Sequence, residues 1–111
     1  MSKKLDKEES FASFLQDNHD KLVLVKFSTA WCPPCRLLQE NIKELLAELE
    51  QSVGQQKDIV VLEVDAEKFP QLRNQFSVRS VPTTFLFHQN KIIKRASGNM
   101  SVQQLREFVG I

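Results

Sequence analysis

Apolar and polar positions follow two alternating patterns along the chain, and these patterns predict an alternation of strands and helices. Two nearly continuous runs of branched apolar residues, at 22–27 and 59–65, are typical of strands buried on both faces of a sheet. Apolar residues spaced three or four positions apart predict four helices, over residues 7–18, 33–51 and 69–76 and from Ser101 onward. Strands that alternate with helices indicate an α/β domain with parallel or mixed strand pairing.

Two further apolar segments, 84–88 and 92–96, flank the polar residues Gln89-Asn90-Lys91. Asparagine tolerates a positive φ angle, so these segments predict a β-hairpin. Residues 3–6 are a candidate short strand at the edge of the sheet. The predicted sheet therefore has four or five strands.

Residues near the helix ends support the predicted boundaries. Asp6 and Glu9 have the spacing of a capping box at the start of the first helix. Ser101 and Gln104 have the same spacing at the start of the last helix. Gly54 follows the longest helical pattern and is expected to end that helix.

Length and composition restrict the class of protein. The chain has 111 residues, which fits one domain spanning residues 1–111. Its 15 basic and 14 acidic residues are mixed along the sequence and leave a net charge of +1, which argues against nucleic-acid binding. No apolar run approaches the ~18 residues that a membrane span needs. We therefore expect a monomer without nucleic-acid or membrane partners.

The start of the sequence bears on the compartment. Residues Met1 to Glu9 contain no apolar segment of the kind found in signal peptides. The expected location is then the cytoplasm, where structural disulfides are rare. A pair of cysteines in that compartment points to redox chemistry or metal binding.

The two cysteines, Cys32 and Cys35, lie at the junction between the first buried strand and the longest predicted helix. A helix N-terminus offers unpaired N–H groups and the positive end of the helix dipole, and both stabilise a thiolate. The thiolate is the reactive form in thiol–disulfide exchange. This position therefore indicates a redox-active pair.

The spacing suggests a role for each cysteine. Cys32 lies just before the first helical turn, where its sulfur is expected to be exposed and to attack a partner's disulfide. Cys35 lies one turn further on the same side, so it is expected to resolve the mixed disulfide. Pro33 and Pro34 fit the first helical positions because N–H groups there have no helical partner.

Two plainer explanations of the cysteine pair compete with the redox hypothesis. A structural zinc site needs four ligands, and the two histidines, His19 and His88, are distant in sequence, so we expect no metal. Two ordinary buried thiols are the other explanation. The consecutive prolines Pro33 and Pro34 argue against it, because such a pair is unusual at a plain helix start.

The segment Trp31-Cys32-Pro33-Pro34-Cys35-Arg36 after a buried strand, with Val81-Pro82-Thr83 before a later strand, resembles the thioredoxin family. The likeness in element order and length covers nearly the whole chain. It implies a thioredoxin fold, which is an α/β fold with a central mixed sheet of four to five strands flanked by about four helices. It also implies a protein-disulfide reductase that serves electron transport and cell redox homeostasis.

The resemblance further implies a substrate-binding groove around the cysteines. Pro82 is expected to form a cis peptide bond and to face the cysteines, while Val81 offers its backbone to a substrate strand. The residues implied for this groove are Trp31, Pro33, Pro34, Val81, Pro82, Gly98 and Asn99. No bound cofactor is implied. Electrons are expected from NADPH through a thioredoxin reductase, and the other partners are proteins that contain disulfides.

The chain departs most from the family at Lys26, six residues before Cys32, where the family has a buried acid. Three outcomes are open for this side chain: an ion pair with Glu63 or Asp65, a neutral amine that accepts a proton from Cys35, or a charge that snorkels to solvent. We favour the pair with Glu63, because the neighbouring strand offers few other polar groups. A charged Lys26 lowers the pKa of nearby thiols, so it is a candidate modulator of the site.

Three alternatives to a disulfide reductase stay open on the sequence. The first keeps the chemistry but changes its partner or direction. The segment Trp31–Arg36 is also similar to the motif of tryparedoxin and nucleoredoxin, which suggests an electron carrier to a peroxidase, and the reverse direction would make the protein an oxidant. The second alternative is a redox-gated binding module that docks a partner without turnover. The third is a dimer bridged by a metal through the two cysteines.

Overall fold

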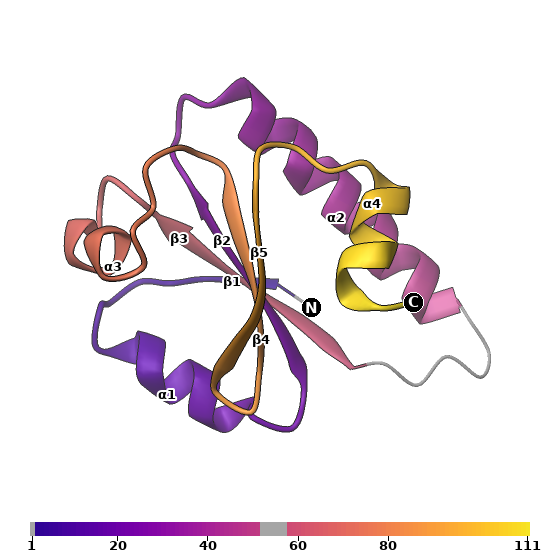
Figure 1. Ribbon diagram of the computed structural model, residues 1–111, viewed down its shortest axis with the longest axis horizontal. Coiled ribbons are helices and arrows are strands. Elements are labelled where there is room, and N and C mark those ends of the chain that lie inside the picture. The colour runs from indigo at the N-terminus through magenta and orange to yellow at the C-terminus, as the bar shows by residue number, and fades with distance from the viewer. Residues whose placement is uncertain (1, 52–57) are drawn as a thin grey trace.

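The computed structural model describes residues 2–51 and 58–111, and these residues form one five-stranded sheet flanked by four helices (Figure 1). The strands are β1 (Ser2–Lys4), β2 (Leu22–Ser28), β3 (Ile59–Asp65), β4 (Thr83–His88) and β5 (Lys91–Ser97). The helices are α1 (Ser10–Asp17), α2 (Pro33–Gln51), α3 (Pro70–Gln75) and α4 (Val102–Val109). The predicted α/β fold class and its element counts are confirmed.

The sheet is mixed, with the strand order β1-β3-β2-β4-β5. Strand β2 lies at its centre, parallel to β3 and antiparallel to β4. This register places Lys26 of β2 opposite Glu63 of β3 on one side and opposite Thr84 of β4 on the other. The two long apolar runs in the sequence are therefore β2 and β3, which lie side by side inside the sheet and are covered on both faces.

Helices α1 and α3 cover one face of the sheet, and α2 and α4 cover the other (Figure 1). Side chains along β2 alternate between the two faces, because successive residues of a strand point in opposite directions. Val25 and Phe27 belong to the apolar cluster under α1 and α3. Leu24 belongs to the cluster under α2 and α4. Lys26 follows Leu24 by two positions and points to the same face.

Helix α2 has the predicted bounds and carries the functional residues at its start. Leu38, Ile42 and Leu45 form its buried stripe, at the three- and four-residue spacing of one helix face. The predicted helix end at Gly54 lies outside the described residues. None of the helices in the described ranges is both long and apolar enough to span a bilayer.

The predicted start of the first helix is wrong. Helix α1 begins at Ser10 rather than residue 7, and its N-cap residue Glu9 makes no side-chain capping bond. The capping box of Asp6 and Glu9 is absent because a backbone turn takes its place: the Ser10 N–H donates to the Lys7 carbonyl at 3.1 Å. Local turn formation competes with side-chain capping at this position.

The predicted start of the last helix is confirmed. The Ser101 hydroxyl accepts from the Gln104 N–H at 3.1 Å, and the Gln104 side chain accepts from the Ser101 N–H at 2.8 Å. This reciprocal pair satisfies two donors that helix geometry leaves without partners. The capping box fixes the start of α4 directly after Met100, whose side chain packs in the cluster under α2 and α4.

The predicted hairpin is confirmed as β4 and β5. Its turn consists of Gln89 and Asn90, with φ angles of 52° and 63°. Two positive φ angles characterise the tight turn whose twist suits a hairpin. The register shifts between Leu86 and Phe87, which is a β-bulge. The predicted edge strand at residues 3–6 is observed one residue earlier at its start, as β1.

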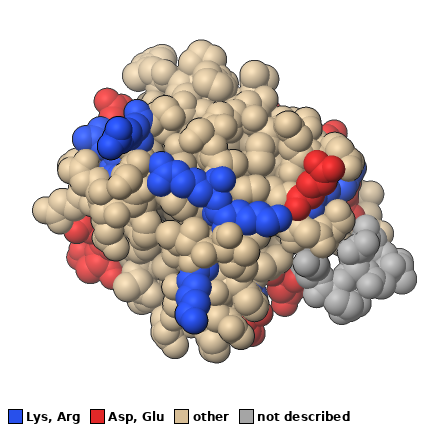
Figure 2. All heavy atoms as spheres, viewed as in Figure 1, with Lys and Arg blue, Asp and Glu red and all other residues tan. Residues whose placement is uncertain are grey.

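Strand β5 presents a basic surface. Its residues Lys91, Lys94 and Arg95 are exposed. Figure 2 shows the basic side chains gathered across this face, with few acidic ones among them. The Arg95 guanidinium is fixed by hydrogen bonds to the carbonyls of Phe76 and Ser77, both at 2.8 Å. Positive charge is therefore concentrated on this surface, although the net charge of the chain is only +1.

Candidate active site

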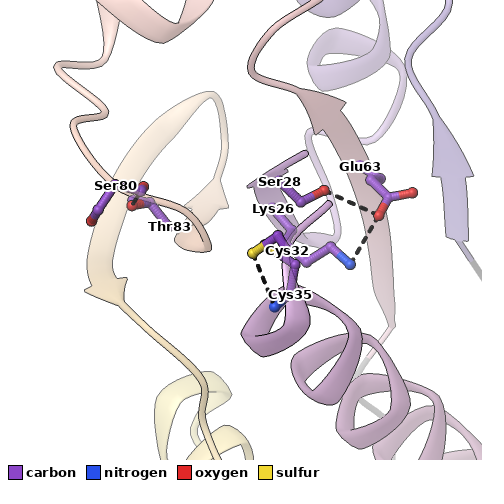
Figure 3. The surroundings of a disulfide bond; sticks show 7 residues. All are labelled: Lys26, Ser28, Cys32, Cys35, Glu63, Ser80 and Thr83. Atoms are coloured by element: carbon purple, nitrogen blue, oxygen red, sulfur yellow. Dashed lines mark hydrogen bonds and ion pairs between the residues drawn. A yellow bond between two sulfur atoms is a disulfide. The ribbon is translucent and has the colours of Figure 1, made fainter. Parts of the chain in front are cut away.

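Cys32 and Cys35 form a disulfide at the start of α2, with their Cα atoms 5.2 Å apart (Figure 3). Cys32 ends the loop that follows β2, and Cys35 lies within the first turn of the helix. Cys32 is 5% and Cys35 3% exposed, so the expected exposure of the Cys32 sulfur is wrong for the disulfide form: the disulfide lies below the surface formed by its neighbours. The structure therefore brings together the two residues that the sequence singled out for thiol–disulfide chemistry.

The first free N–H of helix α2 points at the Cys32 sulfur. Pro33 and Pro34 have no N–H, so the earliest helical donor is the Cys35 N–H, and its nitrogen lies 3.2 Å from Cys32 Sγ. The Cys32 carbonyl accepts the next one, from Arg36, at 3.2 Å. A donor at a helix N-terminus stabilises negative charge on sulfur. This geometry favours a thiolate at Cys32 in the reduced protein.

The residues beside the two buried cysteines are exposed. Trp31 is 86% exposed, although large aromatic side chains are usually mostly buried. Pro33 and Pro34 are exposed as well. Removing such a large apolar ring from water is favourable, so a partner that covers Trp31 would gain binding free energy. Its position next to the disulfide therefore suits contact with a partner.

The Val81–Pro82 peptide bond is cis, as predicted. The loop that contains it is fastened by the Thr83 hydroxyl, which donates to the Ser80 carbonyl at 2.7 Å. Figure 3 shows this segment on one side of the cysteines, while Glu63 lies on the other side. Val81 is partly buried and packs on the cluster under α1 and α3.

The structure connects Gly98 and Asn99 to this loop and to α2. The Gly98 N–H donates to the Pro82 carbonyl at 2.8 Å. Gly98 has a φ of 87°, a conformation that glycine adopts without strain. The Asn41 amide of α2 donates to the Asn99 side-chain oxygen at 3.4 Å. These bonds join the segment after β5 to the loop before β4.

Lys26 is 2% exposed and pairs with Glu63, with its Nζ 2.9 Å from Oε1. The favoured outcome for this residue is therefore confirmed, and the snorkelling alternative is wrong because the ammonium stays inside. The same Glu63 oxygen accepts a hydrogen bond from the Ser28 hydroxyl at 3.3 Å (Figure 3). Asp65, the other candidate partner, instead accepts backbone N–H groups from Glu67 and Lys68 at 2.9 and 3.3 Å.

Two polar neighbours of this pair were missed by the sequence analysis. Ser28 and Thr84 are both buried on the face of Lys26. The Thr84 hydroxyl has no hydrogen-bond partner among the described residues. Strand alternation is a signal that could have found Ser28, because it lies two positions after Lys26. Thr84 required the strand register, which the sequence does not show.

The residues considered as metal ligands lie apart from the disulfide. His88 is paired with Leu22 at the start of β2, and its Nδ1 lies 3.5 Å from the Lys21 carbonyl. Cys32 follows the opposite end of the same strand. In residues 2–51 and 58–111, no three His, Cys, Asp or Glu side chains are grouped so that they could hold a metal ion.

Comparison with known proteins agrees with the fold and the motifs. The thioredoxin family model matches residues 2–110. Thioredoxin Y2 of Arabidopsis thaliana is 38% identical over 106 residues, which cover 93% of this chain and 59% of that protein. A thioredoxin of Chlamydia trachomatis is 34% identical over 91 residues, which cover 82% of this chain and 79% of that protein.

Solved thioredoxin structures share the fold. A thioredoxin from Nicotiana alata superposes with a TM-score of 0.82 at 20% identity, covering 97% of this chain and 89% of that one. A thioredoxin from Fasciola hepatica superposes with a TM-score of 0.81 at 23% identity, covering 96% of this chain and 95% of that one. The predicted thioredoxin fold is confirmed.

The expected cytoplasmic location is wrong. Thioredoxins Y1 and Y2 of Arabidopsis thaliana and thioredoxin Y of Oryza sativa are all named as chloroplastic proteins. The chain spans 59% and 55% of the length of the two Arabidopsis proteins. Net charge and apolar patterning did not reveal the compartment, because cellular destinations are read by receptors from separate address signals rather than from a folded domain.

The family follows from these findings together. A cysteine pair heads a helix after a buried central strand, a cis proline precedes β4, and the matching family model spans nearly the whole chain. The chain belongs to the thioredoxin family of thiol–disulfide oxidoreductases.

Proposed function

We propose that the protein reduces exposed disulfides of other proteins, with Cys32 as the attacking thiolate and Cys35 as the resolving thiol. In the first step the Cys32 sulfur bonds to one substrate sulfur and the other leaves as a thiolate. In the second step Cys35 loses its proton and attacks Cys32, which releases the second substrate sulfur and forms the Cys32–Cys35 disulfide. The substrate gains two electrons and the protein loses two.

One observation supports this assignment most strongly. The Cys35 N–H is aimed at Cys32 Sγ from the first turn of α2, so a negative charge on that sulfur receives both a hydrogen bond and the positive helix end. Cys35 lies within the first turn of the helix, one turn after Cys32, from where its sulfur can reach back to resolve a mixed disulfide. Cys32 is next to Trp31, the most exposed of the large hydrophobic side chains in the described residues.

The proposed substrate groove surrounds Cys32. A substrate strand would lie along the backbone of Val81 and Pro82. Its flanking residues would contact the exposed side chains near the disulfide. The proposed groove residues are Trp31, Pro33, Pro34, Val81, Pro82, Gly98 and Asn99. The bond from Gly98 to the Pro82 carbonyl supports this grouping, because it holds two of the three segments in a fixed relation.

Lys26 is proposed to modulate the cysteines. Its ammonium group is buried on the face of the sheet that α2 covers, and a positive charge inside the protein favours the thiolate form of a neighbouring thiol. The pair with Glu63 offsets part of this charge. Lys26 is therefore a positioning and electrostatic residue, while Cys32 and Cys35 carry the reaction.

The partners proposed are disulfide-containing proteins and a thioredoxin reductase that draws electrons from NADPH. The domain, spanning residues 1–111, would act as a monomer and would need no bound cofactor, because the two sulfur atoms carry both electrons. The names of the thioredoxin Y relatives support a location in a plastid for this protein.

A trapping experiment tests the assignment of roles. Cys35→Ser leaves Cys32 able to attack but removes the resolving thiol, so it should accumulate covalent mixed disulfides with insulin or another disulfide substrate. Cys32→Ser is the matched control and should trap little. Non-reducing gel electrophoresis measures both. Equal trapping by the two variants would reverse the roles. Absence of insulin reduction by the parent protein would contradict the proposed activity and favour a binding module.

A further inference from the structure

A hollow of about 510 Å³ lies between β1, the end of β3 and the first turns of α2. Cys35, Ser28 and Glu63 form part of its wall. Figure 3 shows Glu63 on the side of the cysteines away from Ser80 and Thr83. The hollow is therefore separate from the groove proposed for protein substrates. A smaller hollow of about 130 Å³ shares three of its lining residues.

Positive charge predominates around the two hollows. The cations that line them are Lys3, Lys4, Lys26, Arg36, Lys43 and Lys68. Among the described residues, the carboxylates that line them are Glu63 and Asp65. Both carboxylates are already engaged, Glu63 by Lys26 and Ser28, and Asp65 by two backbone N–H groups. The two carboxylates offset two of the six positive charges, so the lining of the two hollows keeps an excess of positive charge.

Five of these cations are exposed and have no ion-pair partner among residues 2–51 and 58–111; they are Lys3, Lys4, Arg36, Lys43 and Lys68. Lysines spread over a surface usually serve solubility. Here Lys4, Arg36 and Lys68 line the larger hollow, and Lys3, Lys4 and Lys43 line the smaller one. A cleft with an excess of one sign of charge concentrates ions of the opposite sign. Such an excess of positive charge is a feature that neither the fold nor the cysteine chemistry requires.

We propose that this hollow binds a small polyanion, with anionic oxygens held chiefly by Lys4, Arg36 and Lys68. The guanidinium of Arg36 suits two oxygens of one phosphate or carboxylate group, and the lysines supply point charges. No aromatic side chain of the described residues lines either hollow, so they offer no surface on which a nucleobase would stack. The ligand class is therefore a non-aromatic diphosphate or tricarboxylate.

Several contacts are necessary for such a ligand to bind. A single exposed ion pair contributes only about 0.2–1 kcal/mol, and solvent and salt weaken it. One bound anionic group would gain little from one lysine. A ligand with two or more anionic groups engages several of the cations at once, which is why a polyanion rather than a single inorganic ion fits the site.

The test is a titration of the oxidised protein with inorganic pyrophosphate and, separately, with citrate at constant ionic strength. Two-dimensional NMR should show saturable shifts centred on the amides of Lys4, Arg36 and Lys68. Isothermal titration calorimetry gives the affinity. Arg36→Gln and Lys68→Gln should each weaken binding about fivefold, the loss expected for one favourable exposed ion pair.

Matched controls come from the basic surface on β5. Lys91→Gln and Lys94→Gln remove exposed cations distant from the hollow and should leave the affinity unchanged. Tighter binding of pyrophosphate assigns the ligand as a phosphate compound, and tighter binding of citrate assigns a carboxylate. Shifts no stronger than those from sulfate, or an equal loss in the β5 variants, would overturn the proposal. The NMR experiment uses the unaltered protein, so it does not depend on any variant folding.

Discussion

The two faces of the central sheet bury the same strands with different chemistry. The apolar cluster under α1 and α3 contains seven phenylalanines, five of which form a group of rings whose neighbouring centroids lie 5.5–6.3 Å apart. The apolar cluster under α2 and α4 contains no fully buried aromatic ring in the described residues. Beside that cluster, the buried charge of Lys26 and the hydroxyls of Ser28 and Thr84 occupy the same face.

Strand β2 contributes side chains to both faces, and these side chains differ in the same way. Val25 and Phe27 point to the aromatic face, while Lys26 and Ser28 point to the other. The polar positions come at the end of β2 that leads to Cys32. Polar groups inside a protein lower stability unless they find partners, so their concentration beneath the cysteines marks that face as the functional one. The aromatic face supplies packing and bears no charge in its buried cluster.

The largest expected loss of stability comes from removing one ring from the aromatic face. Phe27 is fully buried, and its ring centroid lies 5.7 Å from that of Phe85 and 6.1 Å from that of Phe76. Phe27→Ala should lower the free energy of unfolding by about 3–5 kcal/mol, because a large cavity opens in the core. Urea denaturation measures it. Phe108→Ala on the partly exposed side of α4 is the control and should cost clearly less. Equal losses would contradict the comparison.

The second effect concerns the buried ion pair on the other face. Lys26→Met leaves Glu63 without its partner, and we expect a loss of about 2 kcal/mol in the free energy of unfolding. The loss is smaller than for two fully buried charges because the Glu63 side chain is 20% exposed. The protein should remain folded. The pKa of the cysteine thiols should rise, and resolution by Cys35 should slow. Urea denaturation and pH-dependent alkylation measure the two effects.

Two further variants separate stability from electrostatics at this pair. The double variant Lys26→Met with Glu63→Gln has no unpaired charge, so it should regain most of the stability but keep the raised thiol pKa. Lys91→Met removes an exposed charge at the start of β5, which is paired with His88 at the far end of β4, and should change neither quantity. Thiol titration of Lys26→Met that matches the parent would show that Lys26 has only a structural role.

The smallest effect is a gain in stability at Thr84. Its buried hydroxyl has no hydrogen-bond partner among the described residues and lies opposite Lys26 in the sheet. Thr84→Val keeps the shape of the side chain and removes the unpaired group, so it should raise the free energy of unfolding by about 1 kcal/mol. Thermal denaturation measures the change. Thr83→Val, which removes the bond to the Ser80 carbonyl, should lower stability instead. A loss of stability at Thr84→Val would mean that its hydroxyl does find a partner.

Most of the fold was predictable because its signals are local. The branched apolar runs identified β2 and β3, since such runs suit strands that are buried on both faces. The Ser101 capping box was predicted correctly because both partners are three residues apart. The same rule failed at Asp6 and Glu9, where a backbone turn already satisfied the first donor of α1.

The features of the site differ in the same way: the local ones were predictable from the sequence, and those that join distant segments were not. The sequence alone determined the cysteine pair, its place at a helix start and the choice of thiol–disulfide exchange, because these depend on residues within one turn of each other. Only the tertiary structure decided that Lys26 pairs with Glu63 rather than Asp65, that Thr84 lies opposite it, and that Lys4, Arg36 and Lys68 line one hollow with Cys35. Each of these depends on strand register and helix packing, which join residues far apart in the chain and leave no local pattern to read.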